Sequence, residues 1–115
     1  MNLTDTVIRT HLPALAADMA RCLGEEFPAP PHEMKMRQGL ALAEEAGETV
    51  GALRRYLGLA RRPGSLIELE DEIADVVFTA YLLAHYTGSD LDVAIHRKAE
   101  KIFSRGWRES GGSSS

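Results

Sequence analysis

The chain has 115 residues, of which 44% are hydrophobic, and its formal net charge is −4. This length predicts one domain, and the negative charge excludes a basic surface for a nucleic acid polymer or an anionic membrane. Cys22 is the single cysteine, so no internal disulfide can form and a reducing compartment is favoured. The sequence lacks the pattern of a signal peptide and any apolar run of transmembrane length, which predicts a cytoplasmic protein.

Apolar residues recur at helical spacing, and no segment alternates between apolar and polar residues for long, so an all-α fold is expected. The expected helices cover about residues 4–23, 32–57, 66–86 and 91–107. Pro13 kinks the first helix or marks its true first turn, and Gly24 is expected to end it. Ser65 and Glu68 have the spacing of a capping box at the start of the third helix. One domain over residues 1–110 is expected, followed by a disordered Gly/Ser tail at 111–115.

Two acidic pairs, Glu45 with Glu48 and Glu72 with Asp75, lie within the most apolar helical segments. Residues three apart share one side of a helix, so each pair directs two carboxylates the same way. No Lys or Arg lies three or four residues from any of the four acids. Their mutual repulsion therefore predicts a compensating positive group from outside the helix.

The two pairs have the same offset from the apolar stripes of their helices. With Leu42 and Leu69 as the stripe directions, Glu45 and Glu72 lie about 60° to one side, and Glu48 and Asp75 about 120°. The expected stripes are Leu42, Ala46, Thr49, Val50, Leu53 and Tyr56 on the second helix, and Leu69, Ile73, Val76, Ala80 and Leu83 on the third. Antiparallel packing through these stripes would align the four acids along one seam, where a hard cation such as Mg²⁺ suits oxygen ligands.

Two alternatives to a Mg²⁺ site are less favoured by the sequence. Acidic residues on helices usually form solvated faces, but Asp75 lies between apolar neighbours on both sides, where a solvated face is hard to accommodate. A di-iron carboxylate bundle would need Glu-x-x-His on two helices, and neither acidic pair has such a His. A Mg²⁺ site is therefore favoured.

The segment from Glu44 to Glu48, followed by Asp71 to Asp75, resembles the E-E-x-x-E and E-x-x-D signature of the MazG-like all-α nucleotide pyrophosphohydrolases. The resemblance covers about residues 32–107. It implies a four-helix MazG-like domain that uses Mg²⁺, with Mn²⁺ able to replace it, to hydrolyse a (d)NTP to the (d)NMP and pyrophosphate in nucleotide-pool housecleaning. The implied metal ligands are Glu45, Glu48, Glu72 and Asp75. Glu45 or Glu48 is expected to accept the proton of the attacking water.

Basic residues supply candidates for substrate binding. Lys98 and Arg105 match the Lys and downstream Arg that the family commonly places after E-x-x-D, and they are expected to hold the β and γ phosphates. The helix macrodipole also favours basic residues near a helix C-terminus. Lys35 and Gln38 lie one to three turns before Glu45, where they could touch phosphate or base or form an ordinary polar helix start.

The third helix is apolar on nearly all sides between Ile73 and Ala84, so its surface needs more cover than one short chain provides. A homodimer or homotetramer that completes the helical bundle is expected, as the resemblance also implies. One alternative function is phosphoribosyl-ATP pyrophosphohydrolase. That family usually has a Lys shortly before its first acids, where this chain has Gly-Leu-Ala-Leu-Ala at 39–43. The other alternative is a non-catalytic helical interaction module that keeps a remnant metal site.

Overall fold

The computed structural model describes residues 11–105, and this part of the chain forms four α-helices and no strand. The helices are α2 (Leu12–Glu26), α3 (Pro31–Tyr56), α4 (Leu66–Thr87) and α5 (Leu91–Arg105). The all-α prediction is confirmed, and the bounds of α3 and α4 agree with the expected ranges to within one residue. None of the described helices is both long and apolar enough to cross a membrane.

Some expectations concern parts of the chain outside the described residues. These are the start of the first expected helix at residues 4–10, the last two residues of the fourth at 106–107, and the Gly/Ser tail at 111–115. In the described part, the first helix begins at Leu12 and the fourth ends at Arg105.

Local sequence explains most helix ends. Pro13 lies in the first turn of α2, where its missing N–H has no helical partner to lose. The Ser65 hydroxyl accepts a hydrogen bond from the Glu68 N–H at 3.1 Å, and the Glu68 carboxylate accepts one from the Ser65 N–H at 2.9 Å. The predicted capping box is therefore confirmed. Gly88 ends α4 with a positive φ of 70°, a conformation that favours glycine.

The prediction that Gly24 ends the first helix was wrong, because α2 continues to Glu26. A glycine inside a helix costs only about 1 kcal/mol relative to alanine, which helix packing can offset. The stop comes instead from Pro28, because the residue before a proline is disfavoured in the α conformation. Phe27 accordingly leaves the helix with φ −133° and ψ 63°.

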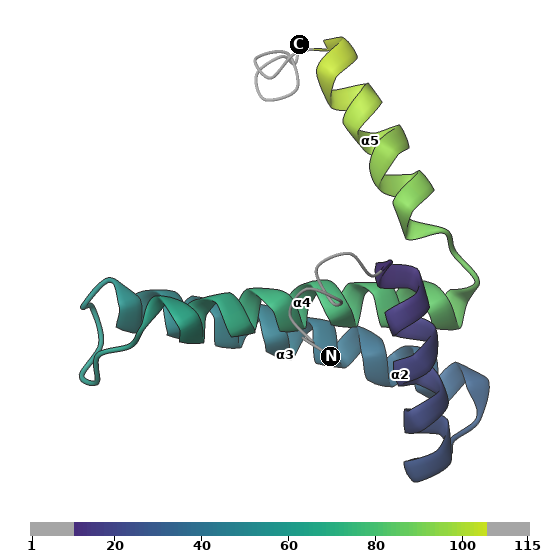
Figure 1. Cartoon of the computed structure of the whole chain (residues 1–115), viewed down its shortest axis with the longest axis horizontal. Helices are drawn as coiled ribbons and strands as arrows, with labels where there is room; N and C mark the ends of the chain where they lie inside the picture. The colour runs from purple at the N-terminus through teal and green to yellow at the C-terminus, as the bar shows by residue number, and fades with distance from the viewer. Residues whose placement is uncertain (1–10, 106–115) are drawn as a thin grey trace, which may run out of the picture.

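The helices α3 and α4 lie side by side and antiparallel, as Figure 1 shows. The shorter α2 packs across α4 near the end that leads into α5. From there, α5 runs away from the α3–α4 pair, and none of its residues is buried. The interface between α3 and α4 is therefore the main packed surface of the described chain.

The face of α3 that packs on α4 differs from the predicted stripe. Ala52 is 1% exposed and Gln38 is buried, whereas Val50 is 57% exposed. Leu53 and Tyr56 on α3 and Ile73 on α4 are also exposed, and so is Ala46. Ala52 therefore packs in the interface in place of its bulkier neighbours. Relative to the prediction, α3 is rotated about its own axis, and Val50, Leu53 and Tyr56 face outward. As a result, the first acid of the predicted set lies inside the interface.

Candidate metal centre

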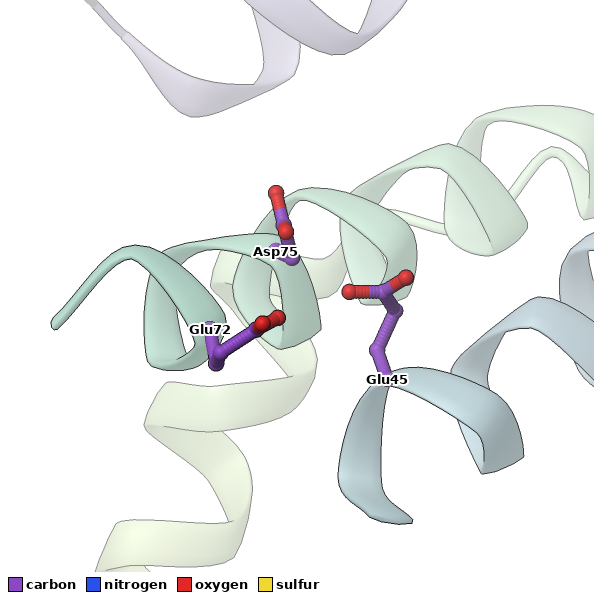
Figure 2. A group of neighbouring side chains, drawn as sticks. All are labelled: Glu45, Glu72 and Asp75. Atoms are coloured by element: carbon purple, nitrogen blue, oxygen red, sulfur yellow. The ribbon is translucent and has the colours of Figure 1, made fainter. Parts of the chain in front are cut away.

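Three of the four predicted acids converge between α3 and α4. Glu45 on α3 and Glu72 and Asp75 on α4 each place one carboxylate oxygen so that all three oxygens lie within 4.8 Å of one another. Figure 2 shows Glu45 and Glu72 reaching toward each other from the two helices, with Asp75 beside them on α4. Glu45 and Glu72 are half-buried, and Asp75 is exposed. This group is called the acid cluster below.

Glu48 lies outside the acid cluster and is exposed. Three residues turn a helix by about 300°, so Glu48 is rotated by about 60° from Glu45 and away from the centre of the interface. Its charge nevertheless raises the pKa of both Glu45 and Glu72, which places it at the edge of the acid cluster. The prediction that four acids form one seam therefore holds for three of them, with Glu48 beside it.

Thr49 fixes the two helices to each other at the acid cluster. Its hydroxyl lies 2.8 Å from the main-chain carbonyl oxygen of Glu45 and 3.2 Å from that of Glu72, and it can donate to either. The first contact is the usual bond of a helical Thr to the residue four positions earlier. The second joins α3 to α4 at a residue that carries one of the converging carboxylates. Sequence reasoning placed Thr49 in an apolar stripe and missed this contact.

The carboxylates of the acid cluster are hard to ionise together. Burial raises the pKa of Glu45 to about 7, with further contributions from the charges of Glu48 and Asp75. The pKa of Glu72 is also raised, first by burial and then by the same two charges, while the positive charge of Arg55 opposes the rise. An added cation would relieve this repulsion.

The donor set fits a hard divalent cation. Oε2 of Glu45 is buried and has no hydrogen-bond partner in the described part of the chain. A buried carboxylate oxygen without a donor is costly, and here two more carboxylates converge on that of Glu45. Oxygen ligands from carboxylates are those that Mg²⁺ and Ca²⁺ prefer. Glu45, Glu72 and Asp75 could therefore hold such an ion.

The predicted substrate-binding residues are dispersed. Gln38 is buried seven residues before Glu45 on the same side of α3, so it lines the interface two turns from the acid cluster. Lys35 is exposed. Lys98 and Arg105 are exposed on α5, which points away from the α3–α4 pair in Figure 1. Within one chain, the structure does not bring these two basic residues to the acid cluster.

Arg55 is a basic residue near the acid cluster that sequence reasoning missed. Its charge acts on Glu72 and Glu68 of α4. Arg55 is seven residues after Glu48 on the same helix, outside the three- and four-residue spacings at which neighbouring charges pair on one helix. For Glu72 the compensating charge therefore comes from outside its own helix, as predicted, whereas every effect on the pKa of Glu45 raises it.

The family model described as the MazG nucleotide pyrophosphohydrolase domain matches residues 35–106, which is more than half of the chain. No curated protein and no solved structure gives a significant match. The matched residues include the whole acid cluster, Glu48, Arg55, Lys98 and Arg105. The chain therefore belongs to the MazG nucleotide pyrophosphohydrolase domain family.

Proposed function

We propose that the protein is a Mg²⁺-dependent nucleoside triphosphate pyrophosphohydrolase, which converts a (d)NTP and water to the (d)NMP and pyrophosphate. Family membership supports nucleotide pyrophosphohydrolase activity in general. The observation that carries the metal dependence is the acid cluster, in which carboxylates from two helices meet beside a buried Glu45 oxygen that lacks a donor. A role in nucleotide-pool housecleaning, in the cytoplasm, is part of the same proposal.

In this proposal, Glu45, Glu72 and Asp75 hold the metal. A divalent cation bound there would neutralise charge on the phosphate oxygens in the transition state. Glu48 accepts the proton of the attacking water, because it is exposed beside the acid cluster and its carboxylate lies outside the converging set. Thr49 keeps α3 and α4 in register, so that the carboxylates stay in place when the substrate binds.

We further propose that a second copy of the chain completes the site. The α3–α4 pair leaves apolar side chains uncovered: Leu40, Val50, Leu53, Tyr56, Ile73 and Val77. The helix α5 also exposes Val93 and Ile95. A homodimer or homotetramer would bury these surfaces. It would also allow α5 of one protomer to bring Lys98 and Arg105 to the acid cluster of its partner, since these residues do not reach it within one chain.

The activity is tested with a panel of canonical and modified nucleoside triphosphates in Mg²⁺, with monophosphate and pyrophosphate measured separately. Release of equal amounts of both products is expected, together with loss of activity on chelation of the metal. Phosphoribosyl-ATP belongs in the panel, because exclusive reaction with it would favour that alternative. Release of diphosphate and inorganic phosphate instead would contradict the proposed cleavage position.

Two variants make this test specific to the acid cluster. Glu72→Gln removes one carboxylate that converges on the others and is expected to reduce kcat by at least about 100-fold. Glu44→Gln removes the same charge from an exposed neighbour of Glu45 outside the acid cluster, and activity should be retained. If the unmodified protein releases no more pyrophosphate than Glu72→Gln from any substrate, the protein is not an enzyme of this class, and a non-catalytic module is the better description.

A further inference from the structure

We propose that Arg55 binds the phosphate chain of the substrate beside the acid cluster, as a cation that each chain supplies to its own site. This inference rests on the proposed function, since it assumes a polyphosphate substrate. It differs from the assignment of Lys98 and Arg105, which need a second copy to reach the same place. Arg55 needs no such partner, because it lies on α3 with Glu45 and Glu48.

The position of Arg55 directs its side chain along α3 toward the acid cluster. Arg55 follows Glu48 by seven residues, which is two helical turns on the same side. Its Nη1 lies 3.4 Å from the point that a Cβ on Gly51 would occupy. Gly51 lies between Glu48 and Arg55 on this side of α3, so the guanidinium extends back over Gly51 in the direction of Glu48. Helical side chains generally lean toward the N-terminus in this way.

The guanidinium of Arg55 acts on nearby acids but forms no ion pair with them within the described residues. Its charge lowers the pKa of Glu68, after larger effects of the Ser65 N–H and Arg62, and it opposes the rise in the pKa of Glu72. The ion pairs within 4.0 Å in the described part of the chain do not include Arg55. Its Nε is buried and has no hydrogen-bond partner among the described residues. Nη1 and Nη2 are not among the buried atoms without a partner, so these two nitrogens, and not Nε, are the donors that an incoming anion can reach.

A purely structural role explains less of this arrangement. Basic residues in the last turn of a helix are stabilised by the macrodipole, and both Arg54 and Arg55 occupy that turn of α3. Arg54 fulfils this role directly, because its Nη2 donates to the Leu59 carbonyl oxygen just beyond the helix. The guanidinium of Arg55 lies over Gly51 instead, one turn back from the helix end. Arg54 therefore caps the end of α3, whereas Arg55 does not.

The chemistry of the guanidinium suits a phosphate chain. Arginine presents several N–H donors in a planar fork, which matches two oxygens of one phosphate group. An acid cluster occupied by a divalent cation still leaves a triphosphate with excess negative charge, so a fixed cation at its edge adds binding energy. Arg55 is separated from Thr49 by six residues, or about 9 Å along the helix axis, and a phosphate chain bridging that span would lie along the seam.

The test compares Arg55→Gln and Arg55→Lys with the matched control Arg54→Gln. Three quantities are measured: KM for a nucleoside triphosphate, the dissociation constant of inorganic tripolyphosphate with Mg²⁺, and that of Mn²⁺ alone. Arg55→Gln is expected to weaken tripolyphosphate binding and raise KM by about 10- to 100-fold, the usual effect of losing hydrogen bonds to a charged group. Arg55→Lys should recover part of this loss, because it keeps the charge without the fork. Arg54→Gln should resemble the unmodified protein.

The Mn²⁺ measurement separates phosphate binding from a positioning role. If Arg55 contacts phosphate, Mn²⁺ affinity in Arg55→Gln stays unchanged or increases, since a positive charge near the acids has been removed. Weaker Mn²⁺ binding with unchanged tripolyphosphate binding would show that Arg55 merely orders Glu72, and would overturn the inference. Equal behaviour of Arg55→Gln and Arg54→Gln would overturn it as well.

If the proposed enzymatic function is wrong but the inference about Arg55 is right, the measurements give a different result. In that case the unmodified protein would hydrolyse no nucleotide, while the binding of tripolyphosphate would still depend on Arg55. If Arg55→Gln does not fold, as judged by circular dichroism, the Arg55→Lys variant carries the test. Its tripolyphosphate binding should then be weaker by about threefold or more, and an unchanged value would reject the inference.

Discussion

The hydroxyl of Thr49 on α3 lies 3.2 Å from the main-chain oxygen of Glu72 on α4. The same hydroxyl is 2.8 Å from the main-chain oxygen of Glu45. One small polar side chain therefore relates the backbones of two residues whose carboxylates converge. This contact lies at the level of the acid cluster, so it couples the packing of the two helices to the geometry of the candidate metal site.

Replacing Thr49 with Val should weaken both stability and metal binding. Valine has nearly the same shape but cannot donate a hydrogen bond, so a loss of about 1 kcal/mol in the free energy of unfolding is expected. For a domain of about 100 residues this corresponds to a fall in Tm of about 4–8 °C. Disturbed ligand geometry should also reduce Mn²⁺ affinity by about tenfold. The control is Thr49→Ser, which keeps the hydroxyl; if it loses as much as Thr49→Val, the hydrogen bond is not the cause.

The raised pKa of Glu45 predicts how stability and metal affinity depend on pH. Its pKa is about 7 in the folded protein and 4.5 ordinarily, so between these values the folded state holds more protons than the unfolded state. Without metal, the free energy of unfolding should therefore fall as the pH rises from about 4.5 to about 7. Metal affinity should increase as the pH rises toward and past about 7, because Glu45 must lose its proton to act as a ligand.

Urea unfolding and Mn²⁺ titration at several pH values check this prediction. Glu45→Gln should flatten the dependence of stability on pH in the absence of metal, whereas Glu44→Gln should preserve it. Mn²⁺ binding by the unmodified protein near pH 6 should also release protons, measurable as a dependence of the binding enthalpy on the buffer. An identical pH slope in Glu45→Gln and the unmodified protein would assign the effect to another group.

Gly64 is expected to tolerate no side chain. A Cβ there would lie 2.7 Å from Cβ of Arg55 and 3.4 Å from its carbonyl carbon, and the Gly64 N–H donates to the Arg55 carbonyl oxygen at 3.2 Å. Gly64→Ala should therefore reduce the free energy of unfolding by about 1–3 kcal/mol. Gly39→Ala is the matched control, because nothing lies within 4 Å of its added Cβ and alanine favours the helix. Urea unfolding at one protein concentration should show opposite shifts for the two variants.

The sequence predicted the helices well because their signals are local. Ser65 and Glu68 specify a helix start within four residues, and Gly88 specifies an end through its positive φ. The rotation of α3 about its own axis was predicted less well. Val50, Leu53 and Tyr56 are bulky and apolar, whereas the buried residues of α3 are Met34, Gln38 and Ala52, so the apolar pattern favoured the wrong face. Which face packs depends on how closely two backbones can approach, and this is a property of both helices together.

The same distinction, between local signals and contacts between two helices, applies to the candidate metal site. The spacing of Glu45, Glu72 and Asp75 predicted their convergence, because each pair of acids is fixed by one helix and the short connection favours antiparallel packing. Arg55 and Thr49 could not be found in this way. Their roles arise from contacts across the interface, which spacing along a single helix does not reveal.

The arrangement of α5 leads to a prediction about shared sites. Lys98 and Arg105 are exposed on a helix that runs away from the acid cluster of its own chain (Figure 1). If they act on the acid cluster of a second copy, a Glu72→Gln chain and a Lys98→Gln/Arg105→Gln chain should each be inactive alone. A dimer mixed from the two would contain one site with both defects and one site with neither.

Mixing the two variants should therefore restore activity to about one quarter of the unmodified level, since random exchange places half of the chains in mixed dimers with one intact site each. The measurement is pyrophosphate release after co-refolding, with each variant refolded alone as the control. Light scattering on the same samples shows whether dimers or tetramers form. If the variants remain inactive together while mixed oligomers are present, Lys98 and Arg105 do not act across the interface, and Arg55 is then the remaining candidate for binding the substrate phosphates.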